Sequence, residues 1–325
     1  MKQGERLTGI EVTTKNEQMN IKSSLRSWRT GSLTVFLFAV SLSPIIRGQT
    51  DRGLLTDPNA PEWVRERIEA PNGHYKTFKS KTIGHEVSYF VYLPKIYEQK
   101  KTERFPVLYW LQGLNKGQGG LPALIKRFDA AIDSGKAPPM LIVFPNSVKD
   151  SFYCDSADGK TPVESVIVKD LIPHIDATYR TIALREGRII EGFSMGGYGA
   201  AHLGFKYPQE FGAVSIIDGS LVDAEAMERG QTALYKRIFG DKGRFAAEDP
   251  RTLLQKNKET IRGKTHIRVV VGKLVPVNSS FHQQLTQLKI DHAYQETNVD
   301  HNPMAIYESL GEKNWEFYRQ ATASR

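Results

Sequence analysis

The sequence predicts an α/β fold in which a mostly parallel sheet is covered by helices on both faces. Short apolar, β-branched runs alternate along the chain with segments of helical spacing, an alternation typical of parallel strands joined by helical crossovers. Several of these runs are apolar throughout, as expected of strands buried on both faces of a sheet. Near the middle of the chain, one run leads through a glycine-flanked serine, Ser194, into a segment rich in Ala, Gly and Leu.

The order of these segments along the chain gives the expected domain organisation. The expected strands lie at residues 86–93, 105–111, 140–144, 189–190, 213–217, 267–271 and 292–297. Helical spacing covers residues 166–179, about 224–239, 280–288 and about 303–318. A lead-in rich in proline and charge suggests a linker at residues 49–72, with one short helix around residues 63–68. The remainder, residues 73–325, is expected to form a single α/β domain.

Residues 1–48 have the features of a targeting segment. An apolar core at residues 33–42 follows Lys22, Arg26 and Arg29. This core is short for a membrane-spanning helix, which needs about 20 apolar residues, and its flanks are typical of a secretory signal peptide. We therefore expect an exported protein, periplasmic or secreted. It would be attached to a membrane only if the segment stays uncleaved as an N-terminal anchor.

The charge and cysteine content exclude several classes of function. The formal net charge is +8, but residues 1–48 hold seven Lys or Arg and three Glu, so the remainder carries +4. No stripe of clustered Lys and Arg is visible, and nucleic-acid binding is therefore not expected. The single cysteine, Cys154, excludes an intramolecular disulfide, and neither it nor the histidines show metal-ligand spacing. We expect no metal and no cofactor.

Ser194 is the most informative residue of the chain. It lies in Gly192-Phe-Ser-Met-Gly196, and Gly197 follows. A serine in a sharp strand-to-helix turn needs small neighbours two residues before and after it, because the chain folds tightly around a strained backbone. Such a turn lifts the hydroxyl out of the sheet and aims the next backbone N–H groups at a developing oxyanion. The pattern predicts a nucleophile elbow and, with the sheet, the α/β-hydrolase fold.

A second donor to that oxyanion is expected after the strand at residues 105–111. Gly113 allows a sharp turn there. The N–H of Leu114 can then join that of Met195 in facing the acyl oxygen.

The general base of this fold is a histidine that follows the serine and an acid in the chain. Five histidines come after Ser194, namely His202, His266, His282, His292 and His301. His202 lies on the elbow's own helix and is expected to point away, and the next three lie within helices or at strand starts. His301 falls in the loop after the last strand, where the base belongs, so we assign this role to His301.

The chain from about Tyr75 to Ala321 resembles the esterase D-like "putative esterase" family of α/β hydrolases, which includes feruloyl, acetyl-xylan and S-formylglutathione-hydrolase-like enzymes. The resemblance rests on residues 87–94, 109–114, 152–160, 170–182 and 191–200. It implies Ser194 as nucleophile, His301 as base, and the N–H groups of Met195 and Leu114 as the oxyanion hole. Gln112 stands where many members have His or Ser, which makes its side chain a candidate contact for the substrate.

The chain departs from this family at the triad acid. Members usually carry an Asp a few residues after the strand at residues 267–271, but residues 272–282 hold neither Asp nor Glu. Three explanations remain open. The acid could be Asp218, at the end of the preceding strand; Asn278 could orient His301 as a neutral group; or the site could be a weakened dyad, or silent. Asp300 is a poor candidate, because an adjacent side chain rarely reaches its neighbour's Nδ1.

These observations favour an exported serine esterase that hydrolyses carboxylic esters through a Ser194 acyl-enzyme. The resemblance makes a small-molecule ester or a carbohydrate-linked acetyl or feruloyl ester the expected substrate. Two alternatives stay open. A non-catalytic binding protein is consistent with the missing acid, and a thioesterase could work with a weak triad because thioesters need less general-base help.

Overall fold

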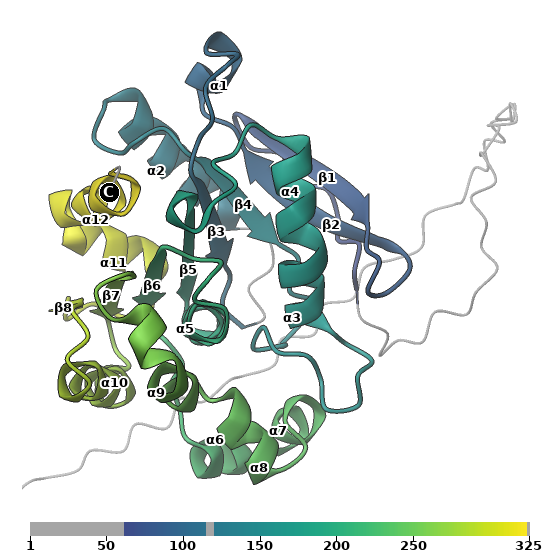
Figure 1. Ribbon diagram of the computed structural model, residues 1–325, viewed down its shortest axis with the longest axis vertical. Coiled ribbons are helices and arrows are strands. Elements are labelled where there is room, and N and C mark those ends of the chain that lie inside the picture. Colours follow the sequence, from purple (N-terminus) through teal and green to yellow (C-terminus); the bar gives the residue numbers. More distant parts are fainter. Residues whose placement is uncertain (1–61, 115–119, 324–325) are drawn as a thin grey trace, which may run out of the picture. The chain divides into compact units, whose positions relative to one another are not determined.

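The structure, a computed structural model, describes residues 62–114 and 120–323 and builds them around one eight-stranded sheet (Figure 1). The strands are β1 (Gly73–Lys79), β2 (Glu86–Tyr92), β3 (Val107–Leu111), β4 (Leu141–Pro145), β5 (Arg188–Phe193), β6 (Ala213–Ile217), β7 (His266–Val271) and β8 (Ala293–Glu296). The larger helices are α2 (Leu121–Asp133), α5 (Met195–Lys206), α9 (Pro250–Ile261), α10 (Val275–Gln287), α11 (Pro303–Leu310) and α12 (Glu312–Thr322). The shorter ones are α1 (Lys95–Gln99), α3 (Val163–Ser165), the π-helical turn η2 (Val166–Leu171), α4 (Ile172–Thr178), the 3₁₀ turn η3 (Arg185–Gly187), α6 (Ala224–Gly230), α7 (Thr232–Ile238) and α8 (Lys242–Glu248).

The strand order β1-β2-β4-β3-β5-β6-β7-β8 includes six neighbouring parallel strands, from β4 to β8, whose carboxyl ends lie together along one edge of the sheet. All pairs from β4 to β8 are parallel, whereas β1 and β2 are antiparallel to their neighbours. In an open parallel sheet the loops at the carboxyl edge form the binding crevice. The fold class predicted from the sequence is therefore confirmed.

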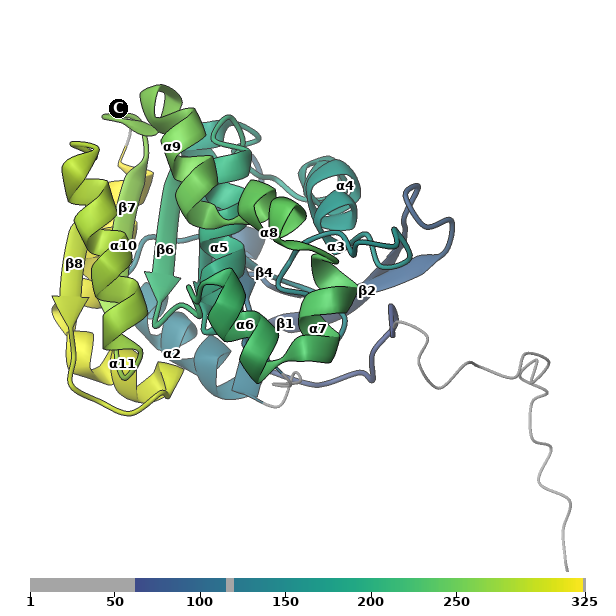
Figure 2. The ribbon, with the colours of Figure 1, turned by 90° about the horizontal axis from the view of Figure 1, so that it is seen from below.

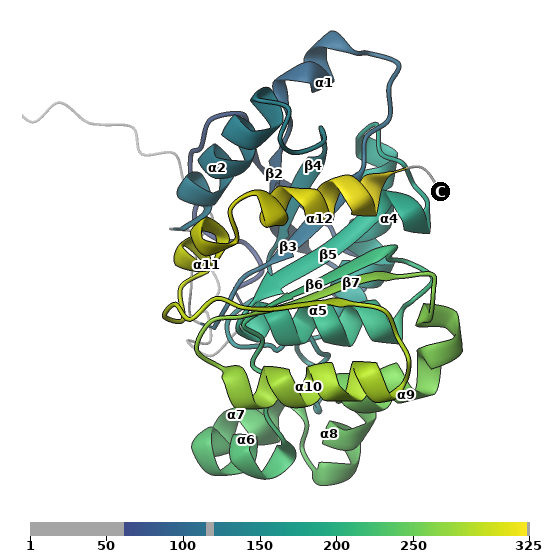
Figure 3. The ribbon, with the colours of Figure 1, turned by 90° about the vertical axis from the view of Figure 1, so that its left-hand side faces the viewer.

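Helices cover both faces of the sheet, so the side chains of the central strands are buried on one face or the other. Figure 3 shows α2, α11 and α12 on one face and α5 and α10 on the other. Each face has its own apolar cluster, one containing Phe128 and Tyr318, the other Leu203 and Phe281. Central strands β3 to β6 are buried along their whole length, which is why β3 and β4 are apolar throughout and the other two are largely apolar.

Several boundaries differ from the sequence expectation. The predicted helix at 224–239 is two helices, α6 and α7, separated at Gln231, whose φ of −147° and ψ of 52° are not helical. The predicted helix at 303–318 is likewise divided, into α11 and α12, at Gly311 with φ of +54°. Figures 1 and 2 show α6, α7 and α8 gathered as a group of short helices beyond α9.

Several elements were missed, and α10 begins at Val275 rather than at residue 280. The missed elements include β1, α1, α2, α8 and α9. Strand β1 pairs only with β2 at the sheet edge and is mostly exposed, so it carries no apolar run that the sequence could reveal. The start of α10 is set by Pro276, which suits the first helical turn because its missing N–H is not needed there.

The short helix expected around residues 63–68 is wrong, because this segment is not helical. Trp63 is buried, and its carbonyl oxygen accepts hydrogen bonds from the Ser88 N–H and from Asn146 Nδ2. These bonds hold the segment against the domain. The apolar core at residues 33–42 lies outside the described residues. Among the residues described, no helix combines the length and apolarity needed to cross a bilayer.

Candidate active site

Ser194 lies between β5 and α5 in a backbone conformation that few residues adopt, with φ of +58° and ψ of −117°. The glycines around it are required by close backbone contacts. A Cβ on Gly192 would lie 2.0 Å from the Gly196 carbonyl oxygen, and a Cβ on Gly196 would lie 2.0 Å from that of Leu111. The strained turn persists because its surroundings hold it, with the Ser194 N–H bonded to the Ile217 carbonyl oxygen at 3.0 Å.

The structure brings Ser194, His301 and Asp218 together in one hydrogen-bonded chain. His301 Nε2 lies 2.8 Å from Ser194 Oγ, and His301 Nδ1 lies 2.6 Å from Asp218 Oδ2. The three residues follow β5, β8 and β6, so the carboxyl edge of the sheet positions all of them. The His301 ring also packs on Phe193, with ring centroids 4.4 Å apart. Only the histidine is substantially accessible, with its side chain 33% exposed.

The Asp218 carboxylate is fully buried and receives four hydrogen bonds. Oδ1 accepts from the N–H groups of Gly272 and Leu274 at 3.0 and 2.9 Å, and Oδ2 accepts from that of Lys273 at 3.1 Å in addition to His301. Burial alone would raise the pKa of Asp218, but the bonds from His301 and the backbone outweigh it and lower the pKa. Asp218 is thus an ionised acceptor, which places the His301 proton on Nδ1 and leaves Nε2 to accept from Ser194.

The other two candidate orienting groups lie elsewhere. Asn278 is buried, and its side chain bonds to the N–H and carbonyl of Gly219 and to the Leu274 carbonyl, not to His301. Asp300 points to solvent, with its side chain 89% exposed and 3.5 Å from Lys273 Nζ. The position next to His301 Nδ1 therefore belongs to Asp218 rather than to Asn278.

The two expected oxyanion donors come from backbone segments next to Ser194. As the first residue of α5, Met195 has an N–H that no preceding helical carbonyl can accept. Gly113 packs so closely that a Cβ on it would lie 3.3 Å from Ser194 Cβ, which brings the backbone leading to Leu114 against the serine. Gln112, expected to contact substrate, is buried and instead donates from Nε2 to Ser147 Oγ at 3.3 Å.

Two neighbours of the site were not singled out from the sequence. Ser220 Oγ lies 3.3 Å from Ser194 Oγ, within reach of the nucleophile. Tyr153 is fully buried, and its hydroxyl donates to the Gln112 carbonyl oxygen at 3.0 Å, which fixes the peptide that precedes Gly113. A signal for Tyr153 existed, because it lies in one of the segments that carry the family resemblance.

Comparison with known proteins identifies the family. A family model described as "Putative esterase" matches residues 80–322, about three quarters of the chain. The chain belongs to this esterase family. An endo-1,4-beta-xylanase/feruloyl esterase from Xylanibacter ruminicola is 30% identical over 189 residues, which cover 55% of this chain and 26% of that protein. An esterase from Mycobacterium tuberculosis is 27% identical over 199 residues, which cover 55% of this chain and 42% of that protein. The chain thus matches less than half the length of either relative.

Solved structures agree on the fold of this esterase-family chain. A ferulic acid esterase superimposes with a TM-score of 0.65 at 23% identity, covering 77% of this chain and 98% of that one. A fluorophosphonate-binding serine hydrolase of Staphylococcus aureus superimposes with a TM-score of 0.64 at 17% identity, covering 79% and 100% of the two chains. At such identities the likeness establishes an α/β-hydrolase architecture.

A second histidine–carboxylate pair is buried between α5, which carries His202, and α3, which carries Glu164. His202 Nε2 lies 2.7 Å from Glu164 Oε2, and His202 Nδ1 lies 2.9 Å from the Glu248 carbonyl oxygen. The side chains of Glu164, His202 and Glu248 are close enough to surround a metal ion. Lys206 Nζ already lies 2.8 Å from Glu164 Oε1 and 2.6 Å from Glu248 Oε2. The lysine therefore supplies the positive charge that a cation would bring.

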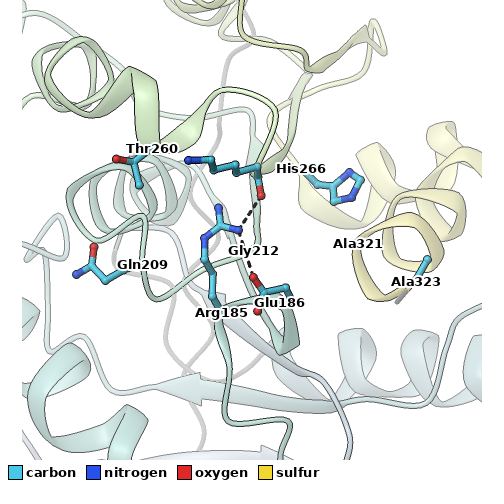
Figure 4. Close-up of a pocket in the computed structure, with 9 residues that line it drawn as sticks. Arg185, Glu186, Gln209, Gly212, Thr260, His266, Ala321 and Ala323 are labelled. Carbon is cyan, nitrogen blue, oxygen red and sulfur yellow. Dashed lines mark hydrogen bonds and ion pairs between the residues drawn. The ribbon is translucent and has the colours of Figure 1, made fainter. Parts of the chain in front are cut away.

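A cavity of about 490 Å³ lies at the opposite edge of the sheet from the triad, next to the amino ends of β5, β6 and β7. Arg185, Gly212 and His266 are among the residues that line it (Figure 4). Its Arg185 guanidinium is engaged within the protein, donating to the Lys264 carbonyl oxygen and pairing with Glu186, as the dashed lines show. This end of an α/β sheet does not usually carry the chemistry, and we assign the cavity no role.

Proposed function

We propose that the protein is a serine carboxylic-ester hydrolase in which Ser194, His301 and Asp218 form the catalytic triad. The observation that carries the proposal is the unbroken hydrogen-bond chain from Asp218 through His301 to Ser194, with contacts of 2.6 and 2.8 Å. Nucleophile, base and orienting acid within hydrogen-bond reach are the parts that acyl transfer requires. Membership of the esterase family supports the same conclusion.

In the proposed mechanism, Ser194 Oγ attacks the ester carbonyl carbon while its proton passes to His301 Nε2. The ionised Asp218 keeps the other ring proton on Nδ1 and stabilises the imidazolium that forms. The N–H groups of Met195 and Leu114 stabilise the tetrahedral oxyanion. When the intermediate collapses, His301 returns its proton to the leaving alcohol, and Ser194 remains acylated. Water activated by His301 then releases the acid and restores the serine.

The Asp218 contact also supports an enzyme over a silent binding protein. The silent alternative arose because residues 272–282, directly after β7, hold neither Asp nor Glu, and the His301 ring would then have lacked an orienting partner. A thioesterase uses the same parts, and no feature of the described residues favours it over an ester hydrolase. For the substrate, we propose carbohydrate-linked acetyl or feruloyl esters, supported by the feruloyl esterase and acetyl esterase names among the relatives.

The test is hydrolysis of p-nitrophenyl acetate by the full chain and by Ser194→Ala. We expect a loss of roughly 10⁶ in kcat for the variant, and Ser134→Ala, a serine on the far end of α2, serves as the matched control. Equal rates for wild type and Ser194→Ala would overturn the proposal. Methyl ferulate, acetylated xylan and an acyl thioester, assayed beside it, rank the acyl groups and leaving groups.

We also propose that the protein is exported, because residues 33–42 and the preceding basic residues are typical of a secretory signal. Cell fractionation with N-terminal sequencing of the recovered protein tests this. A start near residue 49 in the exported fraction is expected, and cytoplasmic protein with an intact N-terminus would contradict export.

A further inference from the structure

The carboxylate of Asp218 depends on a turn that a non-glycine residue rarely forms. Asp218 has φ of +45°, in the left-handed region that disfavours side chains with a Cβ. A residue in such a conformation keeps it only where the surrounding structure enforces it. A neighbouring group therefore has to hold this turn at the end of β6.

The three N–H groups that bind Asp218 come from a different part of the chain. They belong to Gly272, Lys273 and Leu274, which form the connection between β7 and α10. The fit is tight, since a Cβ on Gly272 would lie 3.0 Å from Asp218 Oδ2. The segment after β6, which carries the carboxylate, and the segment after β7, which carries the donors, therefore have to keep a fixed position relative to each other.

Asn278 is the side chain that joins these two connections. Its Oδ1 accepts from the Gly219 N–H at 3.1 Å, and its Nδ2 donates to the Gly219 carbonyl oxygen at 3.0 Å, so one amide satisfies both main-chain groups of the residue after Asp218. The same Nδ2 donates to the Leu274 carbonyl oxygen at 2.8 Å. Asn278 is fully buried on α10, where water cannot replace these bonds.

We propose that Asn278 is a positioning residue for the triad, which acts by clamping the Asp218 turn to the donors that bind its carboxylate. The inference rests on the proposed esterase function for its effect on rate, but not for its effect on His301. The Gly219 N–H requires an acceptor, and the carbonyl oxygens of Gly219 and Leu274 each require a donor. No other side chain of this size offers one acceptor and two donors in one plane. Asn278 touches neither His301 nor the nucleophile, so its influence passes through Asp218.

The experiment compares Asn278→Leu and Asn278→Asp with wild type. Leucine has the same branched heavy-atom skeleton and removes all three hydrogen bonds, whereas aspartate keeps the acceptor and loses the donors. We expect kcat on p-nitrophenyl acetate to fall about 10- to 100-fold in both, because small misplacements of a catalytic group cost up to about 10²-fold. KM should change less than 2-fold, roughly, since Asn278 does not contact substrate. The matched control is Asn314→Leu, a buried amide on α12 that bonds to Arg268.

Two further measurements separate positioning from general loss of structure. In an Asp218→Asn background, Asn278→Leu should cost little additional kcat, because the group on which it acts is already disabled. In ¹⁵N-histidine NMR spectra of the full chain, the Nδ1 proton of His301 should be protected in wild type and in Asn314→Leu but lost in Asn278→Leu. Equal costs in both backgrounds, or an unchanged His301 spectrum in folded Asn278→Leu, would overturn the inference. If wild type showed no Ser194-dependent hydrolysis, the proposed function would fail, while the NMR comparison would still decide the role of Asn278.

Discussion

The described part of the chain contains two histidine–carboxylate pairs with nearly the same N–O distance in opposite environments. His301 Nδ1 and Asp218 Oδ2 are 2.6 Å apart at the carboxyl edge of the sheet. His202 Nε2, on α5, and Glu164 Oε2, on α3, are 2.7 Å apart. The His301 side chain is 33% exposed and its second nitrogen faces a serine hydroxyl. The His202 ring is fully buried, and its second nitrogen faces a backbone carbonyl, which cannot exchange a proton.

The partner of the second ring nitrogen decides what each histidine–carboxylate pair does. Burial alone would lower the pKa of His202, but its contacts with Cys154 and Glu164 outweigh burial and raise the pKa well above the usual value. A protonated ring can hold helices together through its ion pair, but it cannot accept a proton. His301 instead has a free lone pair on Nε2 toward Ser194, as a general base requires.

The largest expected effect separates the two histidines by activity. His301→Gln should lower kcat by roughly 10⁶, the cost of removing the base from a serine triad. His202→Gln should leave kcat per folded molecule unchanged, because His202 does not reach Ser194. Both are measured by ester hydrolysis, normalised by the folded fraction from circular dichroism. A comparable loss of kcat in the folded fraction of His202→Gln would show that His202 also takes part in catalysis.

Asp218→Asn should lower kcat by about 10⁴, because an amide can donate to Nδ1 and so favour the wrong ring tautomer. The chain itself offers the control, Asp300→Asn, which removes the adjacent and exposed carboxylate. Steady-state rates of the two variants test the assignment. A large loss in Asp300→Asn with a small one in Asp218→Asn would reverse it.

Glu164→Gln is expected to act on stability. Removing the carboxylate leaves a buried charged His202 without its partner, which typically costs about 3–5 kcal/mol. Urea unfolding measures the loss, and kcat of the folded enzyme should stay the same. Glu98→Gln, which breaks the exposed pair with Lys101, is the control and should leave the unfolding midpoint nearly unchanged. A stability loss no greater than that of the control would show that the buried pair is dispensable.

The pH dependence of stability should report the same buried pair. Despite burial, which alone would raise it, the bonds from His202, Lys206 and Tyr207 lower the pKa of Glu164 from 4.5 to about 2. Its contribution, on the order of 3 kcal/mol, is present above the unfolded pKa and is lost as pH falls from about 4.5 through about 2. The pKa of His202 is raised, so its effect on stability depends on pH in the opposite direction. The stabilisation from His202 is complete below the unfolded pKa of about 6.5 and is lost as pH rises through the folded pKa. Urea unfolding between pH 2 and 9 should show both losses, and Glu164→Gln should flatten the acidic one.

The sequence revealed the parts of the site that depend on neighbouring residues. The elbow around Ser194 was visible because its glycines lie within three residues of the serine. His301 was found because chain order places the base after the last strand. The orienting acid stayed open among Asp218, Asn278 and no acid at all, because the contact with His301 Nδ1 joins residues 83 positions apart.

Most of the features that were not predicted have no side-chain pattern in the sequence. The donors to Asp218 are backbone N–H groups, so the residues at 273 and 274 gave no sign of them. Strand β1 escaped notice because an exposed edge strand needs no apolar run. The break in residues 303–318 did have a signal, since Gly311 adopts φ of +54°. The break at Gln231 had one as well, because α6 ends at Gly230.

The backbone cradle around Asp218 also determines which changes this region of the gene can tolerate. Because main-chain groups bind the carboxylate, almost any residue at positions 273 and 274 supplies the same donors, and only proline would remove one. Substitutions there are neutral for the triad, whereas inserting or deleting a single residue would shift all three donors at once. The constraint on this connection is therefore its length, and its side chains remain free to diverge with the substrate.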